Sequence, residues 1–192
     1  MSIGEYARLH RNAVSTAPPL AFHSVNVPDR PGYRRGLQRH HLLPRQLRSL
    51  HWSAKLIDSL GAQSIGFEDF RTNGLLLPGE ERLALRLALP LHRGPHPVYN
   101  ELVAERVGTI ERQWQVDRRT DFVEARRTGL MRLRLLQAAL RKRLLTTSRR
   151  PLRLNRHDPL GRDTDFSELD DLVGTLWSDT ADAVNAGYQA AS

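Results

Sequence analysis

The stretch that decides the fold reads Leu91-His92-Arg93-Gly94-Pro95-His96-Pro97. Its two histidines are separated by three residues, a spacing at which two imidazoles can bind the same divalent ion. Proline is favoured at the first position of a helix and pushes the preceding residue, here His96, out of the helical conformation. Apolar residues then recur at helical spacing from Tyr99 to Trp114. We therefore expect a helix from Pro97 to about Gln115, with His96 at its N-terminus.

A second histidine pair lies upstream, in the run Arg39-His40-His41-Leu42-Leu43-Pro44. Adjacent side chains of an extended segment point to opposite sides, so His40 and His41 can have different roles, one as a metal ligand and the other as a base. A neutral histidine can deprotonate water near pH 7, because its unperturbed pKa is about 6.5. The residues alone leave open which of the two is the ligand.

The elements around these pairs are predicted from apolar periodicity. Ala21–Val27 alternates like a short strand, and Gly74–Leu77 is a short apolar run typical of a strand. Arg45–Leu60 has the spacing of an amphipathic helix, and a second long helix is expected over residues 121–146. Residues 83–89 alternate like a strand but consist of helix formers, so their structure stays undecided.

Composition narrows the chemistry. The 192 residues include no cysteine, which excludes disulfides, cysteine-bound metal centres and thiol nucleophiles. The formal net charge is +8, and it is unevenly distributed, because residues 161–192 carry −6 and the remainder +14. Nearly all of the basic residues are arginines, whose planar guanidinium suits phosphate. A polyanionic partner is expected, nucleic acid before an anionic membrane.

Arginines gather on the second long helix. Residues 118–153 contain twelve lysines and arginines against two acidic residues. Arg127, Arg134 and Arg141 are seven residues apart, so they fall near one stripe of a helix and are expected to contact backbone phosphates. Arg93 is a candidate for contact with the phosphate at the site of reaction.

Taken together, these residues resemble the AHH group of the HNH/endonuclease VII nucleases, which are built on a ββα-metal core. The two histidine runs carry the resemblance, together with Asp69-Phe70, Asn73-Gly74-Leu75-Leu76-Leu77-Pro78 and Val98-Tyr99-Asn100. The resemblance covers about residues 36–114. One departure is plain: Arg39 stands where the group has its alanine, a position not expected to take part in the chemistry.

The resemblance implies roles for individual residues. His41 would be the general base that activates water. One divalent ion (Mg, Mn, Ni or Zn) would be held by His40, His92 and His96. Asn73, which we place with His41 in the catalytic group, would orient the hairpin or the base through its side-chain hydrogen bonds.

The expected fold is α+β and mostly helical, a ββα-metal core with a helix inserted between its strands and a helical extension at the C-terminus. We divide the chain into a loop-rich segment at 1–35, an HNH-like core at 36–116, a basic helix and linker at 117–160, and an acidic helical tail at 161–192. The tail has an apolar stripe, and folding back over the basic surface would let it compete with nucleic acid.

The expected function is a metal-dependent endonuclease that hydrolyses phosphodiester bonds, of DNA before RNA. A bacterial toxin role with an immunity protein as partner is compatible with the resemblance. The main alternative is a non-catalytic basic module that binds nucleic acid and whose histidines hold a structural metal or simply pack.

A third hypothesis is a protein that lies on a membrane surface through the 121–146 helix. The arginines of this helix are scattered and Phe122 is its only aromatic residue, and both features count against the hypothesis. No apolar run is long enough to insert in a membrane and no signal peptide is visible, so we expect a cytoplasmic protein or one delivered into a target cell.

Overall fold

The structure is a computed structural model that describes residues 18–146, 154, 158 and 174. One two-stranded antiparallel sheet lies among helices, so the fold is α+β and mostly helical, as predicted. The elements follow in the order η1 (Phe22–Ser24), β1 (Leu37–His41), η2 (Arg45–Arg48), α2 (His51–Leu60), α3 (Ala62–Ile65), α4 (Phe70–Asn73), β2 (Gly74–Pro78), α5 (Glu81–Leu87), α6 (Pro97–Asp117) and α7 (Phe122–Leu145).

The hairpin contains a long helical insertion. β1 pairs with β2 so that Leu37 lies opposite Pro78 and His41 opposite Gly74. Residues 42–73, between the strands, form η2, α2, α3 and α4, so the predicted insertion is present. The helix predicted over Arg45–Leu60 is broken at Leu50, whose backbone is extended. The break is stabilised by the buried Ser53 hydroxyl, which donates to the main-chain carbonyls of Leu47 and Leu50.

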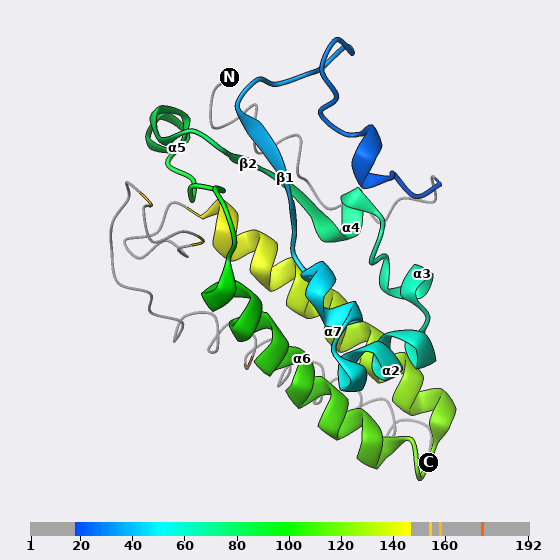
Figure 1. The fold of residues 1–192 in the computed structure, drawn as a ribbon. Coiled ribbons are helices and arrows are strands. Elements are labelled where there is room, and N and C mark those ends of the chain that lie inside the picture. The colour runs from blue at the N-terminus through cyan, green and yellow to red at the C-terminus, as the bar shows by residue number, and fades with distance from the viewer. Residues whose placement is uncertain (1–17, 147–153, 155–157, 159–173, 175–192) are drawn as a thin grey trace, which may run out of the picture.

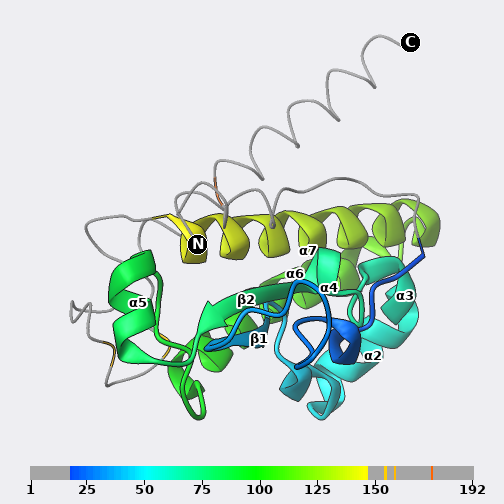
Figure 2. The same ribbon diagram turned by 90° about the horizontal axis from the view of Figure 1, so that it is seen from above.

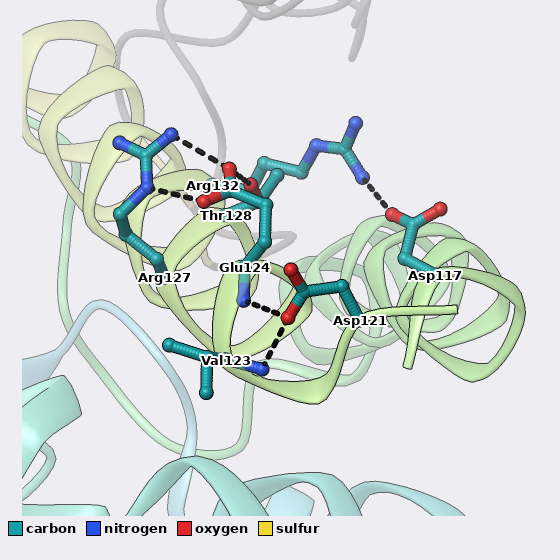
Figure 3. A network of polar contacts seen from close by, with 7 residues as sticks. All are labelled: Asp117, Asp121, Val123, Glu124, Arg127, Thr128 and Arg132. Carbon is teal, nitrogen blue, oxygen red and sulfur yellow. Dashed lines mark hydrogen bonds and ion pairs between the residues drawn. The ribbon is translucent and has the colours of Figure 1, made fainter. Parts of the chain in front are cut away.

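α6 and α7 form the scaffold of the molecule. They lie antiparallel and side by side, and the hairpin and α2 pack against them (Figure 1, Figure 2). The main core joins buried side chains of these elements, among them Leu56, Leu60, Leu75, Leu77, Val103, Val107, Trp114, Leu133, Leu136 and Leu140. Both helices match the sequence prediction within two residues, and Asp121 caps α7 by accepting from the main-chain N–H of Val123 and Glu124 (Figure 3).

In one short segment the structure differs from the prediction, and in another it decides between the two structures that the sequence left open. The strand predicted at Ala21–Val27 is wrong: Ala21 makes a single bridge to Asp69, and the next residues turn as η1. Asn26 lies in a left-handed conformation and its amide bonds to the main chain of Arg34 and Leu37, which turns the chain away from a strand. The undecided residues 83–89 lie mostly in α5, because helical spacing buries Leu83, Ala84 and Leu87 on one face.

The N-terminal segment is tied to the rest of the molecule. The Leu20 N–H donates to Asp69 Oδ1 at 2.9 Å, the Phe70 N–H donates to the Leu20 carbonyl at 2.7 Å, and Arg71 Nη1 donates to the Pro18 carbonyl at 2.6 Å. These bonds cross the boundary predicted at residue 35, and the division into four segments stays a prediction. The predicted acidic tail, apart from Gly174, lies outside the described residues, as does the basic linker apart from Leu154 and Asp158.

No helix in the described part of the chain has the length and apolarity required to span a bilayer.

Candidate metal centre and base

β1 presents its two histidines on opposite faces, as the alternation of a strand requires. The buried His40 ring faces three aromatic neighbours, with ring centroids 5.0 Å from His92, 5.7 Å from His96 and 4.8 Å from Tyr99. The His41 ring lies instead against Phe22, 3.7 Å away and within 2° of parallel. The two imidazoles therefore occupy different environments, which permits different roles.

The three predicted metal ligands, His40, His92 and His96, converge in the structure. One ring nitrogen from each of His40, His92 and His96 lies within 4.8 Å of the other two. The loop between α5 and α6 brings the last two together, because Gly94 has φ of +75°, a left-handed conformation that favours glycine. Next to β2, the His92 N–H donates to the Pro78 carbonyl at 2.7 Å, and His96 is the N-cap of α6.

Hydrogen bonds leave the Nε2 atoms available as ligands. His92 Nδ1 lies 3.1 Å from Gln38 Oε1, and His96 Nδ1 lies 3.1 Å from the main-chain oxygen of Leu154. Because both partners are oxygens, each Nδ1 carries the proton and Nε2 has the lone pair. His40 Nε2 is buried and has no hydrogen-bond partner within the described residues. A divalent ion would satisfy this nitrogen, so the residues present fit a metal.

The electrostatics favour the neutral, metal-binding form of these rings. Burial holds the pKa of His40 well below its usual range, and the neighbouring histidines lower it further. Burial, with His96 and His41 nearby, lowers the pKa of His92 to about 4. The pKa of His96 is also lowered by burial, against the opposing hydrogen bond to Leu154. Neutral imidazoles bind metal without first releasing a proton.

The surroundings of His41 keep its imidazole neutral. Burial, with Arg45 and Arg39 nearby and against the opposing charge of Glu68, lowers its pKa to about 4. The ring is therefore neutral at pH 7 and retains a lone pair for general base chemistry.

Asn73 joins the two ends of the insertion. Its fully buried amide donates to the carbonyls of Leu43 and Phe67 at 3.2 and 2.9 Å, and its oxygen accepts from the Leu43 N–H at 2.7 Å and from Gln137 Nε2 at 3.2 Å. None of these bonds reaches His41. Asn73 thus holds the chain at Leu43, two residues beyond His41, and its role in catalysis stays a prediction.

Comparison with known proteins identifies the family. The family model of AHH, a nuclease family of the HNH/ENDO VII superfamily with a conserved AHH motif, matches residues 22–139. This chain belongs to the AHH family. The match includes the hairpin, the three convergent histidines and most of α7, and it extends beyond residues 36–114 at both ends. No curated protein and no solved structure matches the chain significantly.

This AHH family member supports its histidines with residues that the sequence analysis missed. Gln38 lies two residues before His40 on β1, and period-two spacing is a signal that could have placed it on the same face. The carbonyl of Leu154 has no such signal, because any residue carries one. Asp158, buried, accepts from the Leu91 N–H at 3.0 Å and holds the start of the loop that carries His92.

The four predicted phosphate-binding arginines divide in two. Arg141 contradicts the prediction: it is buried, and its Nη2 donates to the carbonyls of Arg71 and Thr72 at 2.7 and 3.1 Å. A seven-residue spacing drifts by about 20° per repeat around a straight helix, which turns the last member of the stripe toward α4. The other three, Arg93, Arg127 and Arg134, are exposed.

All three exposed arginines make contacts within this AHH fold. Arg93 Nη1 lies 3.9 Å from Glu81 Oε1. Arg127 is bidentate to Glu124, at 2.8 and 2.6 Å (Figure 3). Arg134 Nη2 donates to the Ser64 carbonyl at 3.0 Å. Contact with phosphate remains a prediction for these two and for Arg93.

Proposed function

We propose that this AHH family member is a metal-dependent endonuclease that hydrolyses phosphodiester bonds of nucleic acid, DNA before RNA. The observation that carries the proposal is the cluster of three imidazoles formed by His40, His92 and His96. Among the described residues, the buried His40 Nε2 in this cluster has no hydrogen-bond partner. Family membership supports nucleic acid as the substrate.

The chemistry would be shared between the two faces of β1. A divalent ion held by His40, His92 and His96 would stabilise negative charge on the phosphate and on the leaving oxygen. His41 would take a proton from water, whose oxygen forms a new bond to phosphorus while the bond to the leaving oxygen breaks. The leaving oxygen then takes a proton from solvent. Asn73 would keep the hairpin in the geometry that this transfer needs.

Surface arginines would hold the polyanion. We propose that Arg93, which follows the ligand His92, contacts the phosphate near the reaction, and that Arg127 and Arg134 contact backbone phosphates farther away. Such contacts carry no sequence information and weaken steeply with salt.

We also propose a toxin-type role in the cytoplasm of a target cell, with an immunity protein as partner. Membership of the AHH nuclease family is compatible with this role. Induced expression of the wild type in bacteria should arrest growth and degrade the nucleoid, whereas His41→Ala should do neither.

A plasmid assay tests the enzymatic proposal. Purified protein should nick supercoiled DNA with at least one of Mg²⁺, Mn²⁺, Ni²⁺ or Zn²⁺, and EDTA should stop the reaction. His41→Ala should lose about 10²- to 10⁴-fold in rate while it still binds the metal, because only the base is removed. His40→Ala should lose both metal binding and cleavage.

The same assay separates the alternative. A non-catalytic binding module would shift DNA or RNA in a gel, equally in wild type and His41→Ala, and would cleave neither substrate with any metal. Parallel RNA digests decide between the two nucleic acids.

A further inference from the structure

His41 lacks the usual means of fixing a catalytic imidazole. A second ring nitrogen that donates to a carboxylate or carbonyl commonly sets the orientation of such a ring. Among the described residues, no hydrogen bond to either nitrogen of His41 is formed. Its contact is instead the face of Phe22, at 3.7 Å between ring centroids and 2° between ring planes.

Phe22 is itself held from two directions. The ring of Phe70 meets it edge-on, with centroids 5.2 Å apart and planes at 76°. Arg39, on β1, donates from Nη1 to the main-chain carbonyl of Phe22 at 2.9 Å. Arg39 occupies the alanine position of the AHH motif, and alanine has no side-chain donor for this bond.

We propose that Phe22 is a positioning residue for His41, and that Arg39 fixes Phe22 in place. The inference rests on the proposed role of His41 as the base. The N-terminal segment that carries Phe22 is then part of the active site, although Phe22 lies fifteen residues before the start of β1.

The parallel stack suits a base. It fixes the plane of the imidazole while both nitrogens stay at the ring edge, where water and phosphate can approach. A phenyl ring neither donates nor accepts the proton that His41 must carry, so it orients the base without competing for it. A hydrogen-bonding partner would have raised or lowered the basicity of the ring as well as orienting it.

The first test detects the stack without any substrate. In ¹³C,¹⁵N-labelled protein, the carbon-bound ring protons of His41 should resonate upfield, because they lie over the face of Phe22. Phe22→Leu should remove this shift and Phe22→Trp should keep it. Tyr33→Leu is the matched aromatic-to-aliphatic control, since Tyr33 is an exposed residue of the same segment, and it should leave the resonance unchanged.

The second test measures cleavage. Phe22→Leu should lower kcat by about 10- to 100-fold, the effect expected when a reacting group is misplaced by about an ångström. In Phe22→Leu, KM and metal affinity should stay at wild-type values. Phe22→Tyr and Phe22→Trp keep an aromatic ring at this position and should retain the wild-type kcat. Arg39→Ala should have a smaller effect. The double variant Phe22→Leu/Arg39→Ala should have nearly the same kcat as Phe22→Leu alone, because both changes break the same arrangement.

The outcomes are distinguishable. A His41 resonance that does not move in Phe22→Leu overturns the stack, and a resonance that moves while kcat stays unchanged overturns its role in positioning. If Phe22→Leu fails to fold by circular dichroism, the Tyr and Trp variants and Arg39→Ala still decide. A wild type that shows the upfield resonance and binds metal but cleaves nothing overturns the proposed function, and with it the use of the stack in catalysis.

Discussion

At the scale of single residues, His92 and His96 are each oriented through Nδ1 by a partner from another part of the chain. Gln38 lies 54 positions before His92 and Leu154 58 positions after His96. Both bonds set the proton on Nδ1 and leave Nε2 unprotonated, with its lone pair available to bind an ion. The ligands are thereby arranged before an ion arrives, which reduces the ordering cost of binding it.

Replacement of Gln38 tests this arrangement. Gln38→Leu keeps a side chain of similar size but removes the oxygen that accepts from His92, so we expect Zn²⁺ affinity to fall about 10- to 100-fold. Isothermal titration calorimetry measures the change. Gln113→Leu, on the exposed surface of α6, should bind Zn²⁺ as the wild type does. Equal affinities for both variants would contradict the orienting role of Gln38.

Prediction from sequence is strongest for residues whose side chains carry the chemistry. The spacing of His92 and His96 predicted that these two face one another, and the alternation of His40 and His41 predicted that only one of that pair joins them. The resemblance to the AHH nucleases was needed to choose His40. The sequence could not predict the Leu154 carbonyl or the burial of Arg141, because both depend on how distant segments meet. A heptad stripe is equally compatible with a solvated and a buried guanidinium.

At the scale of elements, the loop between α5 and α6 determines whether the two downstream ligands meet. Gly94 takes a left-handed conformation there. Pro95 and Pro97 lie on either side of His96 and restrict the backbone conformations of this stretch. The loop is also held by Asp158 at Leu91 and by the end of β2 at His92.

Gly94→Ala should disturb this loop. A side chain at φ of +75° costs about 1 to 2 kcal/mol in the left-handed region, and relief of that strain would move His92 relative to His96. We expect weaker metal binding in a competition assay with a chromogenic chelator.

Gly32→Ala is the matched control for that variant. Its φ is +84° and it has open space around it, so it carries the same backbone strain away from the histidines. It should lose stability but retain metal affinity. Metal binding lost to the same extent in both variants would show a general destabilisation instead.

Long elements were easier to predict than short ones, for a physical reason. α6 and α7 repeat their apolar pattern over five or more turns and have clear start signals in Pro97 and Asp121. Residues 21–27 and 83–89 span too few residues for a period to decide. Hydrogen bonds of Asn26 determine the conformation of residues 21–27, and burial of Leu83 and Leu87 on one face determines that most of residues 83–89 are helical.

At the scale of the whole molecule, the histidine cluster joins parts of the chain that lie on different elements. A two-stranded hairpin is marginal alone in water, and here it is supported by the α6–α7 pair. The ion would link β1 to the loop that leads into α6, so metal binding should stabilise the entire fold.

Thermal unfolding measures that link. At a free Zn²⁺ concentration of 100 times Kd, the free energy of unfolding should rise by about 2.7 kcal/mol. For a domain of this size, the rise corresponds to roughly 5 to 10 °C in Tm. His40→Ala should show no such rise, whereas His41→Ala should show all of it. A rise that persists in His40→Ala would place the ion elsewhere.

The hydrogen bond from His96 to the Leu154 carbonyl also bears on the order in which the site is completed during synthesis. A nascent chain that has already emerged past His96 contains all three histidines of the cluster, yet the oxygen that orients the last of them is still to be translated. The same is true of Asp158, which holds Leu91. The cluster therefore reaches the geometry described here only after residues 154 and 158 have been synthesised.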